Sequence, residues 1–136
     1  MPTYERLTIV MPVYNEAAVV GEVLKELRKT FPHVVCVDDG SSDDSARICA
    51  EAGAVVVQHP INLGQGAALQ TGFEYALQDP AMDCVVTFDS DGQHRVADAW
   101  DMVERIRSGE AEVVLGSRFL DGRTRISPLK RVVLRT

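Results

Sequence analysis

Short runs of hydrophobic residues alternate along the chain with longer segments whose hydrophobic positions recur at helical spacing. The short runs are rich in valine and predict β-strands over residues 7–13, 34–37, 55–57, 84–88 and 113–115. Between them, helices are predicted over residues 17–29, from Ser41 or Ser42 to Gly53, over 66–77 and over 96–106. The first of these has Val20, Leu24 and Leu27 on one face.

Strands that alternate with helices predict parallel βαβ units, and uninterrupted hydrophobic strands predict burial on both faces. The expected fold class is therefore α/β, an open and mostly parallel sheet with helices on both faces. The 136 residues suit one domain, 1–136, because domains commonly contain roughly 100–200 residues.

Composition narrows the classes of function. Hydrophobic residues make up 46% of the chain and the net charge is −6, which fits a globular protein and gives no expectation of a nucleic-acid partner. No hydrophobic run approaches the ~20 residues of a membrane span, and the N-terminus does not resemble a secretory signal. The three cysteines are odd in number and widely spaced, which predicts buried, reduced thiols in a cytoplasmic protein.

Polar and glycine-rich segments follow each predicted strand. In open α/β sheets, ligands bind outside the carboxyl ends of the strands, so these segments are candidates for a site. They begin, in chain order, at Pro12, Asp38, His59, Asp89 and Gly116. Each alone is compatible with an ordinary turn, but together at one sheet edge they favour a binding site.

Among these segments, the side chains of Asp89-Ser90-Asp91 point most clearly to a chemical role. Two carboxylates at the end of a buried strand repel each other unless a cation compensates, and Mg²⁺ or Mn²⁺ takes such oxygen ligands together with substrate phosphates. Gln93 offers a further oxygen. The alternative is a solvated turn. An EF-hand is excluded because Trp100, and not Glu, occupies the twelfth position counted from Asp89.

Other residues at this edge have two interpretations each. Asp39 can accept hydrogen bonds from a base or ribose, or it can belong to a helix-opening turn. Tyr14 can lie against a base, or it is a half-buried residue at a strand end. Arg118 offers a planar fork suited to phosphate, or it forms a surface ion pair. His33 and His59 are interpreted as surface or turn residues.

Taken together, the ordered motifs resemble those of family 2 glycosyltransferases, which have the GT-A fold. The similarity extends from about residue 7 to 131 and is greatest to the branch of dolichyl- and polyprenyl-phosphate mannosyltransferases. The motifs that carry it are Pro12-Val13-Tyr14-Asn15-Glu16, Val37-Asp38-Asp39-Gly40-Ser41-Ser42-Asp43, Asn62-Leu63-Gly64-Gln65-Gly66-Ala67-Ala68, Asp89-Ser90-Asp91-Gly92-Gln93-His94 and Gly116-Ser117-Arg118.

The resemblance implies roles for individual residues. The metal ligands would be Asp89, Asp91 and Gln93, with Mg²⁺ or Mn²⁺ as the cofactor. The catalytic residues would be Asp91 and Arg118. The substrate-binding residues would be Pro12, Tyr14 and Glu16 in the nucleoside pocket, Asp39 and the backbone of Val37 at the base or ribose, Ser90 at the ribose or phosphate, and Arg118 with Arg131 at the diphosphate.

The implied reaction moves a sugar, with inversion, from GDP-mannose or a UDP-sugar to an acceptor. A polyprenyl or dolichyl phosphate acceptor is already anionic and needs no general base, whereas a saccharide hydroxyl needs one. Relatives continue beyond the Gly-Ser-Arg segment, so the resemblance also implies a GT-A domain truncated at its C-terminal side.

Two features of the sequence suggest partners beyond the substrates. The basic stretch 123–135 predicts peripheral contact with the cytoplasmic face of a membrane, or else a solvated or phosphate-binding segment. An incomplete sheet leaves an open edge, which favours a homodimer. Two other functions stay open: a module that binds a nucleotide-sugar but does not transfer it, and a sugar nucleotidyltransferase. Tyr14-Asn15-Glu16 disfavours the latter, which usually has a glycine-rich stretch at this point.

Overall fold

The described residues form one six-stranded sheet with the strand order β3-β2-β1-β4-β6-β5. The computed structural model describes residues 6–82, 84–90, 101, 103, 104, 113–116 and 131–135. The strands are β1 (Leu7–Val13), β2 (Val34–Asp38), β3 (Val55–Gln58), β4 (Cys84–Thr87), β5 (Val113–Gly116) and β6 (Arg131–Arg135). All five strands expected from the hydrophobic runs are present.

The sheet is mostly parallel, as predicted. β1 lies between β2 and β4 and is parallel to both, and β3 is parallel to β2. β6 was not predicted: it is antiparallel to β4 on one side and to β5 on the other. Its hydrophobic core is only the triplet 132–134 between two arginines, so the basic charge of this segment concealed its strand character.

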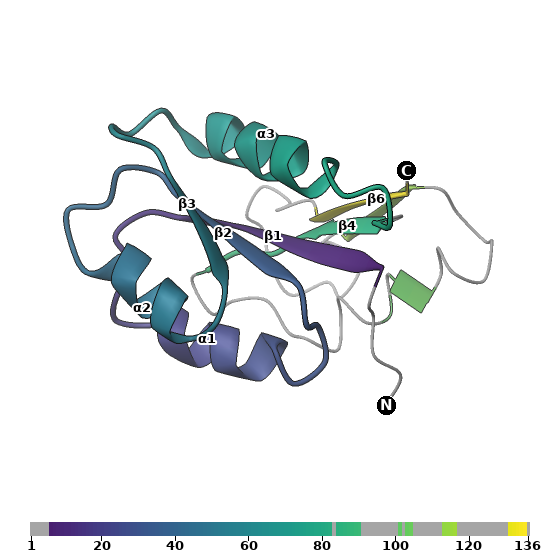
Figure 1. The fold of residues 1–136 in the computed structure, drawn as a ribbon, viewed down its shortest axis with the longest axis horizontal. Coiled ribbons are helices and arrows are strands. Elements are labelled where there is room, and N and C mark those ends of the chain that lie inside the picture. Colours follow the sequence, from purple (N-terminus) through teal and green to yellow (C-terminus); the bar gives the residue numbers. More distant parts are fainter. Residues whose placement is uncertain are drawn as a thin grey trace, which may run out of the picture.

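Helices cover both faces of the sheet, which confirms the predicted α/β class (Figure 1). α1 (Val20–Leu27) and α2 (Ser45–Glu51) lie on one face, and α3 (Gln65–Ala76) lies on the other. Side chains alternate along a strand, so β1 supplies both layers. Ile9 and Met11 pack with α1, whereas Val10 packs with Ala76 of α3.

The larger core lies between the sheet and the pair α1 and α2. Leu24, Leu27 and Phe31 are fully buried there against β1. Val103 is also fully buried in this core. It is helical, as are Asp101 and Glu104, and the rest of the helix predicted over 96–106 lies outside the described residues.

Three local expectations are wrong, each for an identifiable reason. β3 is an edge strand of the sheet, so Val55 is 45% exposed, where burial on both faces was expected. α1 begins at Val20, because residues 17–19 form a turn that precedes it. α2 begins at Ser45, and neither Ser41 nor Ser42 caps it, because both bond to the loop after β1.

The cysteines are buried and free, as predicted. A hydrogen bond with Cys49, together with burial, raises the pKa of the Cys36 thiol, so this thiol stays protonated at neutral pH. Within the part of the chain that the structure describes, no helix has the length and hydrophobicity needed to cross a membrane.

Candidate functional site

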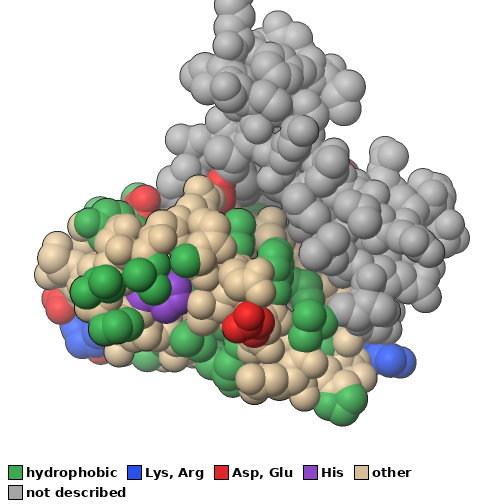
Figure 2. Space-filling model, turned by 90° about the horizontal axis from the view of Figure 1, so that it is seen from above, with side chains coloured by type: hydrophobic (Ala, Val, Ile, Leu, Met, Phe, Trp, Pro, Cys, Tyr) green, Lys and Arg blue, Asp and Glu red, His purple; other side chains and the backbone are tan. Residues whose placement is uncertain are grey.

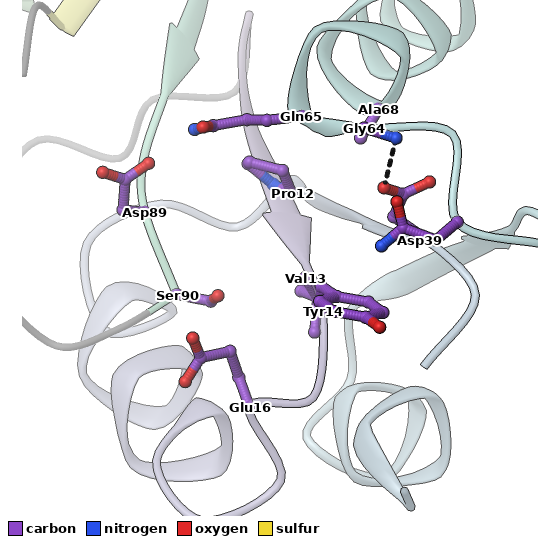
Figure 3. A pocket seen from close by; sticks show the side chains of 11 residues that line it. Pro12, Val13, Tyr14, Glu16, Asp39, Gly64, Gln65, Ala68, Asp89 and Ser90 are labelled. Atoms are coloured by element: carbon purple, nitrogen blue, oxygen red, sulfur yellow. Dashed lines mark hydrogen bonds between the residues drawn. The ribbon is translucent and has the colours of Figure 1, made fainter. Parts of the chain in front are cut away.

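A pocket of about 360 Å³ opens at the carboxyl ends of β1, β2 and β4, beside the first turn of α3. The pocket is where the parallel strands end together, so polar segments far apart in the sequence meet there (Figure 3). The lining residues are Pro12, Val13, Tyr14, Glu16, Asp39, Asn62, Gly64, Gln65, Ala68, Asp89 and Ser90.

Most of the described residues that the sequence singled out converge on this pocket. Those that line it are Pro12, Tyr14, Glu16, Asp39, Asp89 and Ser90. In Figure 3, Asp89 and Asp39 lie on opposite sides with Pro12 between them. Asn62, Gln65 and Ala68 also line the pocket although the sequence analysis assigned them no role. The signal for them was the glycine-rich segment that follows β3.

The other predicted site residues lie elsewhere in the fold or outside the described residues. Val37 is fully buried in β2, where it packs with Ala68, and it does not line the pocket. Asp91, Gln93 and Arg118 lie outside the described residues. The backbone of Arg131 begins β6 and pairs with Gly116 at the carboxyl end of β5, which places it on the same edge of the sheet as the pocket.

Asp39 is held by the segment that follows β3. Its Oδ1 accepts hydrogen bonds from His59 Nδ1 and from the backbone N–H of Leu63, both at 2.8 Å, and its Oδ2 accepts one from Gly64 N–H at 2.8 Å. Burial raises the pKa of this carboxyl, but the three hydrogen bonds outweigh burial and hold the pKa below its usual value. Asp39 is therefore ionised at neutral pH.

His59 was interpreted from sequence as a surface or turn residue: it does lie in the loop directly after β3, but its side chain is not on the surface. Its side chain is only 9% exposed and bridges Asp39 to α3, because Nε2 lies 2.8 Å from Thr71 Oγ1. The position just after β3 resembles a turn in the sequence. The partners of the imidazole come from the loop after β2 and from α3, and no local pattern brings them together.

Two glycines allow this close approach of the loops. Gly40 has φ +75°, and a β-carbon there would lie 2.5 Å from the carbonyl carbon of Ile61 and 2.6 Å from Asn62 N. Gly64 has φ +100° and turns its N–H onto Asp39. Residues other than glycine rarely adopt either of these backbone conformations.

A second set of hydrogen bonds ties the loop after β1 to the loop after β2. Asn15 has φ 51°, a left-handed conformation that asparagine tolerates better than most residues. Its N–H donates to Ser41 Oγ at 2.9 Å, and its Oδ1 accepts from Ser42 N–H at 2.8 Å. These bonds fix the position of the neighbours Tyr14 and Glu16, which line the pocket.

Asp43 and Ser45 extend this connection to the start of α1. Ser45 Oγ accepts from Glu16 N–H at 2.9 Å and donates to Asp43 Oδ1, while Asp43 Oδ2 accepts from Ala17 N–H at 3.2 Å. The hydrogen bond from the Ser45 hydroxyl is the main reason that the pKa of Asp43 lies below its usual value. The pocket wall formed by the two loops is thus pre-organised.

The pocket is acidic. Glu16, Asp39 and Asp89 contribute carboxylates, and none of the described lining residues is Lys or Arg. An anionic ligand would need a bound cation or a basic residue from elsewhere in order to enter such a pocket. Among the described residues, no cluster of three or more His, Cys, Asp or Glu side chains is arranged to hold a metal ion. Of the three metal ligands that the resemblance implies, Asp89 is the one that the structure describes, and its carboxylate is an oxygen donor of the type that Mg²⁺ and Mn²⁺ prefer.

A match to a protein-family model identifies the family to which this chain belongs. The model of glycosyl transferase family 2 matches residues 8–127, which includes every described residue that lines the pocket. The chain belongs to glycosyl transferase family 2. The resemblance read from the motifs is thereby confirmed.

Two archaeal glycosyltransferases are similar to this chain over most of its length. The glycosyltransferase AglJ of Haloferax volcanii is 35% identical over 90% of the chain and 39% of its own length. The UDP-N-acetylglucosamine–dolichyl-phosphate N-acetylglucosaminyltransferase of Methanococcus voltae is 30% identical over 82% of the chain and 51% of its own length. The chain thus spans about half the length, or less, of these relatives.

The fold is also found in solved structures of a glycosyl-transferring enzyme. A crystal structure of glucosyl-3-phosphoglycerate synthase from Mycobacterium tuberculosis matches 95% of the chain and 56% of its own chain, with a TM-score of 0.73 and 22% identity, which supports the fold. Another crystal structure of that enzyme, in complex with Mn²⁺, UDP-glucose and phosphoglyceric acid, matches 76% of the chain and 40% of its own, with a TM-score of 0.64 and 26% identity.

Proposed function

We propose that this chain is the donor-binding portion of a metal-dependent glycosyltransferase that uses a nucleotide-diphosphate sugar. The observation that carries the proposal is the convergence of six predicted residues, from three different strand ends, on one pocket: Pro12, Tyr14, Glu16, Asp39, Asp89 and Ser90. Family membership and the Mn²⁺ and UDP-glucose bound by a structural neighbour support it.

The nucleoside would occupy the side of the pocket formed by Tyr14 and Asp39. Tyr14 is 49% exposed, which leaves apolar area for a base to cover. Asp39 is ionised and borders the pocket, so it can accept a hydrogen bond from an N–H group of the base. UDP-sugars and GDP-mannose both remain candidate donors on this basis.

The diphosphate would occupy the opposite side, near Asp89 and Ser90. Asp89, with Asp91 and Gln93, would hold Mg²⁺ or Mn²⁺, which supplies positive charge to offset the charge that grows on the leaving diphosphate. Arg118 and Arg131 would add cationic groups at the same edge of the sheet. The backbone position of Arg131, paired with Gly116, supports that expectation for one of them.

The acceptor we propose is a polyprenyl or dolichyl phosphate, attacked with inversion at the sugar. Support comes from the dolichyl-phosphate enzyme of Methanococcus voltae and from an undecaprenyl-phosphate transferase of Klebsiella pneumoniae that is 31% identical over 79% of the chain. A phosphate acceptor is ionised at neutral pH and needs no base. Such an acceptor would bring the protein to the cytoplasmic face of a membrane.

A second candidate function is a nucleotide-sugar-binding module that does not transfer the sugar. Such a module needs only the donor pocket, which the described residues line. A transfer assay from radiolabelled donor to polyprenyl phosphate separates the two candidates, because only an enzyme gives a labelled lipid.

Calorimetry tests the proposed donor site. UDP and GDP are titrated into the full chain with Mn²⁺, with Mg²⁺ and with EDTA. We expect binding with metal only, and loss of binding in Asp89→Asn. The control is Glu22→Gln, which removes one carboxylate from the exposed surface of α1. Equal affinity with and without metal, or unchanged affinity in Asp89→Asn, would refute the proposal.

A further inference from the structure

We propose that His59 is a specificity-determining residue for the nucleobase and that Thr71 positions it, because His59 and the Leu63 N–H occupy one oxygen of Asp39 and leave a single acceptor for the base. The inference rests on the proposed function. It concerns a pair of residues, one after β3 and one on α3, that do not line the pocket themselves.

The hydrogen bonds define the arrangement. The His59 imidazole lies between two polar atoms, 2.8 Å from Asp39 Oδ1 on one side and 2.8 Å from Thr71 Oγ1 on the other. The side chains of His59 and Asp39 are 9% and 5% exposed. At that burial, water cannot readily replace either bond, so the imidazole has one well-defined orientation.

Chemistry fixes the tautomer of the neutral imidazole. Because Asp39 is an ionised carboxylate, it can only accept, so Nδ1 of His59 must carry the proton and donate it. Nε2 is then an acceptor, and the Thr71 hydroxyl donates to it. Thr71 therefore favours the tautomer that bonds to Asp39, which is how a residue of α3 acts on the pocket.

The number of acceptor positions on Asp39 leads to base specificity. A carboxylate offers about four lone-pair positions, two on each oxygen. His59 and Leu63 use Oδ1, and Gly64 uses Oδ2, so the remaining acceptor is on Oδ2. One acceptor matches the single imide N–H of uracil, which lies between two carbonyl groups.

Guanine requires a different number of hydrogen-bond acceptors. It presents adjacent N1–H and N2–H donors, which pair best with both oxygens of one carboxylate. With Oδ1 already occupied, guanine would have to leave one donor without its partner or displace His59. Uridine nucleotides should therefore bind more tightly than guanosine nucleotides, by about tenfold for one unmade hydrogen bond of ordinary strength.

The experiment measures the UDP and GDP affinities of the full chain with Mn²⁺ by calorimetry. The wild type should prefer UDP about tenfold. His59→Leu frees one of the two acceptor positions on Oδ1, while Leu63 keeps the other, and should bring the ratio of affinities close to one. His59→Asn retains an amide donor near the position of Nδ1 and should keep most of the preference. Thr71→Val should lower it only in part, and thermal unfolding checks that each variant is folded.

Long-range ¹H–¹⁵N NMR of the imidazoles gives a second readout that requires no nucleotide. The chain has three histidines, and the signal lost in His59→Asn identifies His59. We expect the Nδ1–H tautomer in the wild type and a shift toward Nε2–H in Thr71→Val. The Nε2–H tautomer in the wild type would overturn the inference.

The outcomes separate this inference from the proposed function. A wild type that binds neither nucleotide refutes both. A wild type that binds UDP and GDP equally, or a His59→Leu variant with an unchanged ratio, refutes the inference alone and leaves the donor site standing.

Discussion

Gly72 lies where α3 comes closest to the sheet, so its replacement by alanine tests how tightly that layer is packed. The residue is buried, and a β-carbon there would overlap Cγ1 of Val10 and lie 3.3 Å from Cγ2 of Val37. Gly66 belongs to the same helix, but a β-carbon at that position meets no atom within 4 Å. Gly66→Ala is therefore the matched control.

The expected change in the free energy of unfolding of Gly72→Ala follows from two opposing effects. Carbon atoms rest at about 3.5–4.0 Å, so the alanine must push Val10 out of its rotamer or move α3 away from β1. Overpacking of this kind costs about 1–3 kcal/mol, and the overlap places Gly72→Ala in the upper half of that range. The better helix propensity of alanine returns up to ~1 kcal/mol. The net loss should be about 1–2 kcal/mol, whereas Gly66→Ala should be neutral or slightly stabilising.

Urea unfolding followed by circular dichroism measures both variants, and a double-mutant cycle with Val10→Ala identifies the cause. If the clash with Val10 is responsible, the two substitutions should couple favourably by about 1 kcal/mol or more. A Gly72→Ala protein as stable as Gly66→Ala would show that α3 does not contact β1 as described. Strictly additive effects would show that the cost arises elsewhere.

Three further predictions concern stability. The pKa of Asp39 is lowered in the folded state, so its contribution to the free energy of unfolding is present above its unfolded pKa of about 3.9 and is lost as the pH falls through the lower folded value. In a profile of urea stability against pH, Asp39→Asn should therefore reduce the loss of stability on the acid side. Parallel profiles for the wild type and the variant would contradict this. Asn15→Ala removes the bonds to Ser42 and strains a left-handed residue, so unfolding should become easier by about 1–2 kcal/mol, with Asn15→Gly intermediate. Val55→Thr, on the exposed edge strand, should change the unfolding free energy by less than about 0.5 kcal/mol, and a larger loss would mean that this side chain is buried.

The sequence predicted the elements of the fold better than their places in the sheet. The valine-rich runs of β2 and β3 are nearly identical, yet Val37 is fully buried and Val55 is 45% exposed. The difference arises because β2 lies between two strands and β3 lies at the edge. Strand order depends on contacts between distant segments, and the hydrophobic pattern of one strand carries no information about them.

The candidate site was predictable to the extent that the sheet positions it. Parallel strands end at one edge, so the polar residues that follow them meet, as Tyr14, Asp39 and Asp89 do. The support behind those residues was not predictable. His59 and Asp39 are 20 positions apart, and their bond depends on the register in which β3 pairs with β2, where Asp38 lies opposite Gln58. An imidazole after a strand looks the same in sequence whether it faces water or a carboxylate.

Because of the position of β6 in the sheet, the order in which the strands join the sheet differs from the order in which they are synthesised. Among the described strands, β5 contacts the sheet through β6 alone, although residues 113–116 leave the ribosome before residues 131–135. A nascent chain can therefore pair β1 through β4 while β5 still has no neighbour. Joining the two halves of the sheet waits for a five-residue strand, and a proline introduced into it would leave β5 unattached while sparing the parallel part.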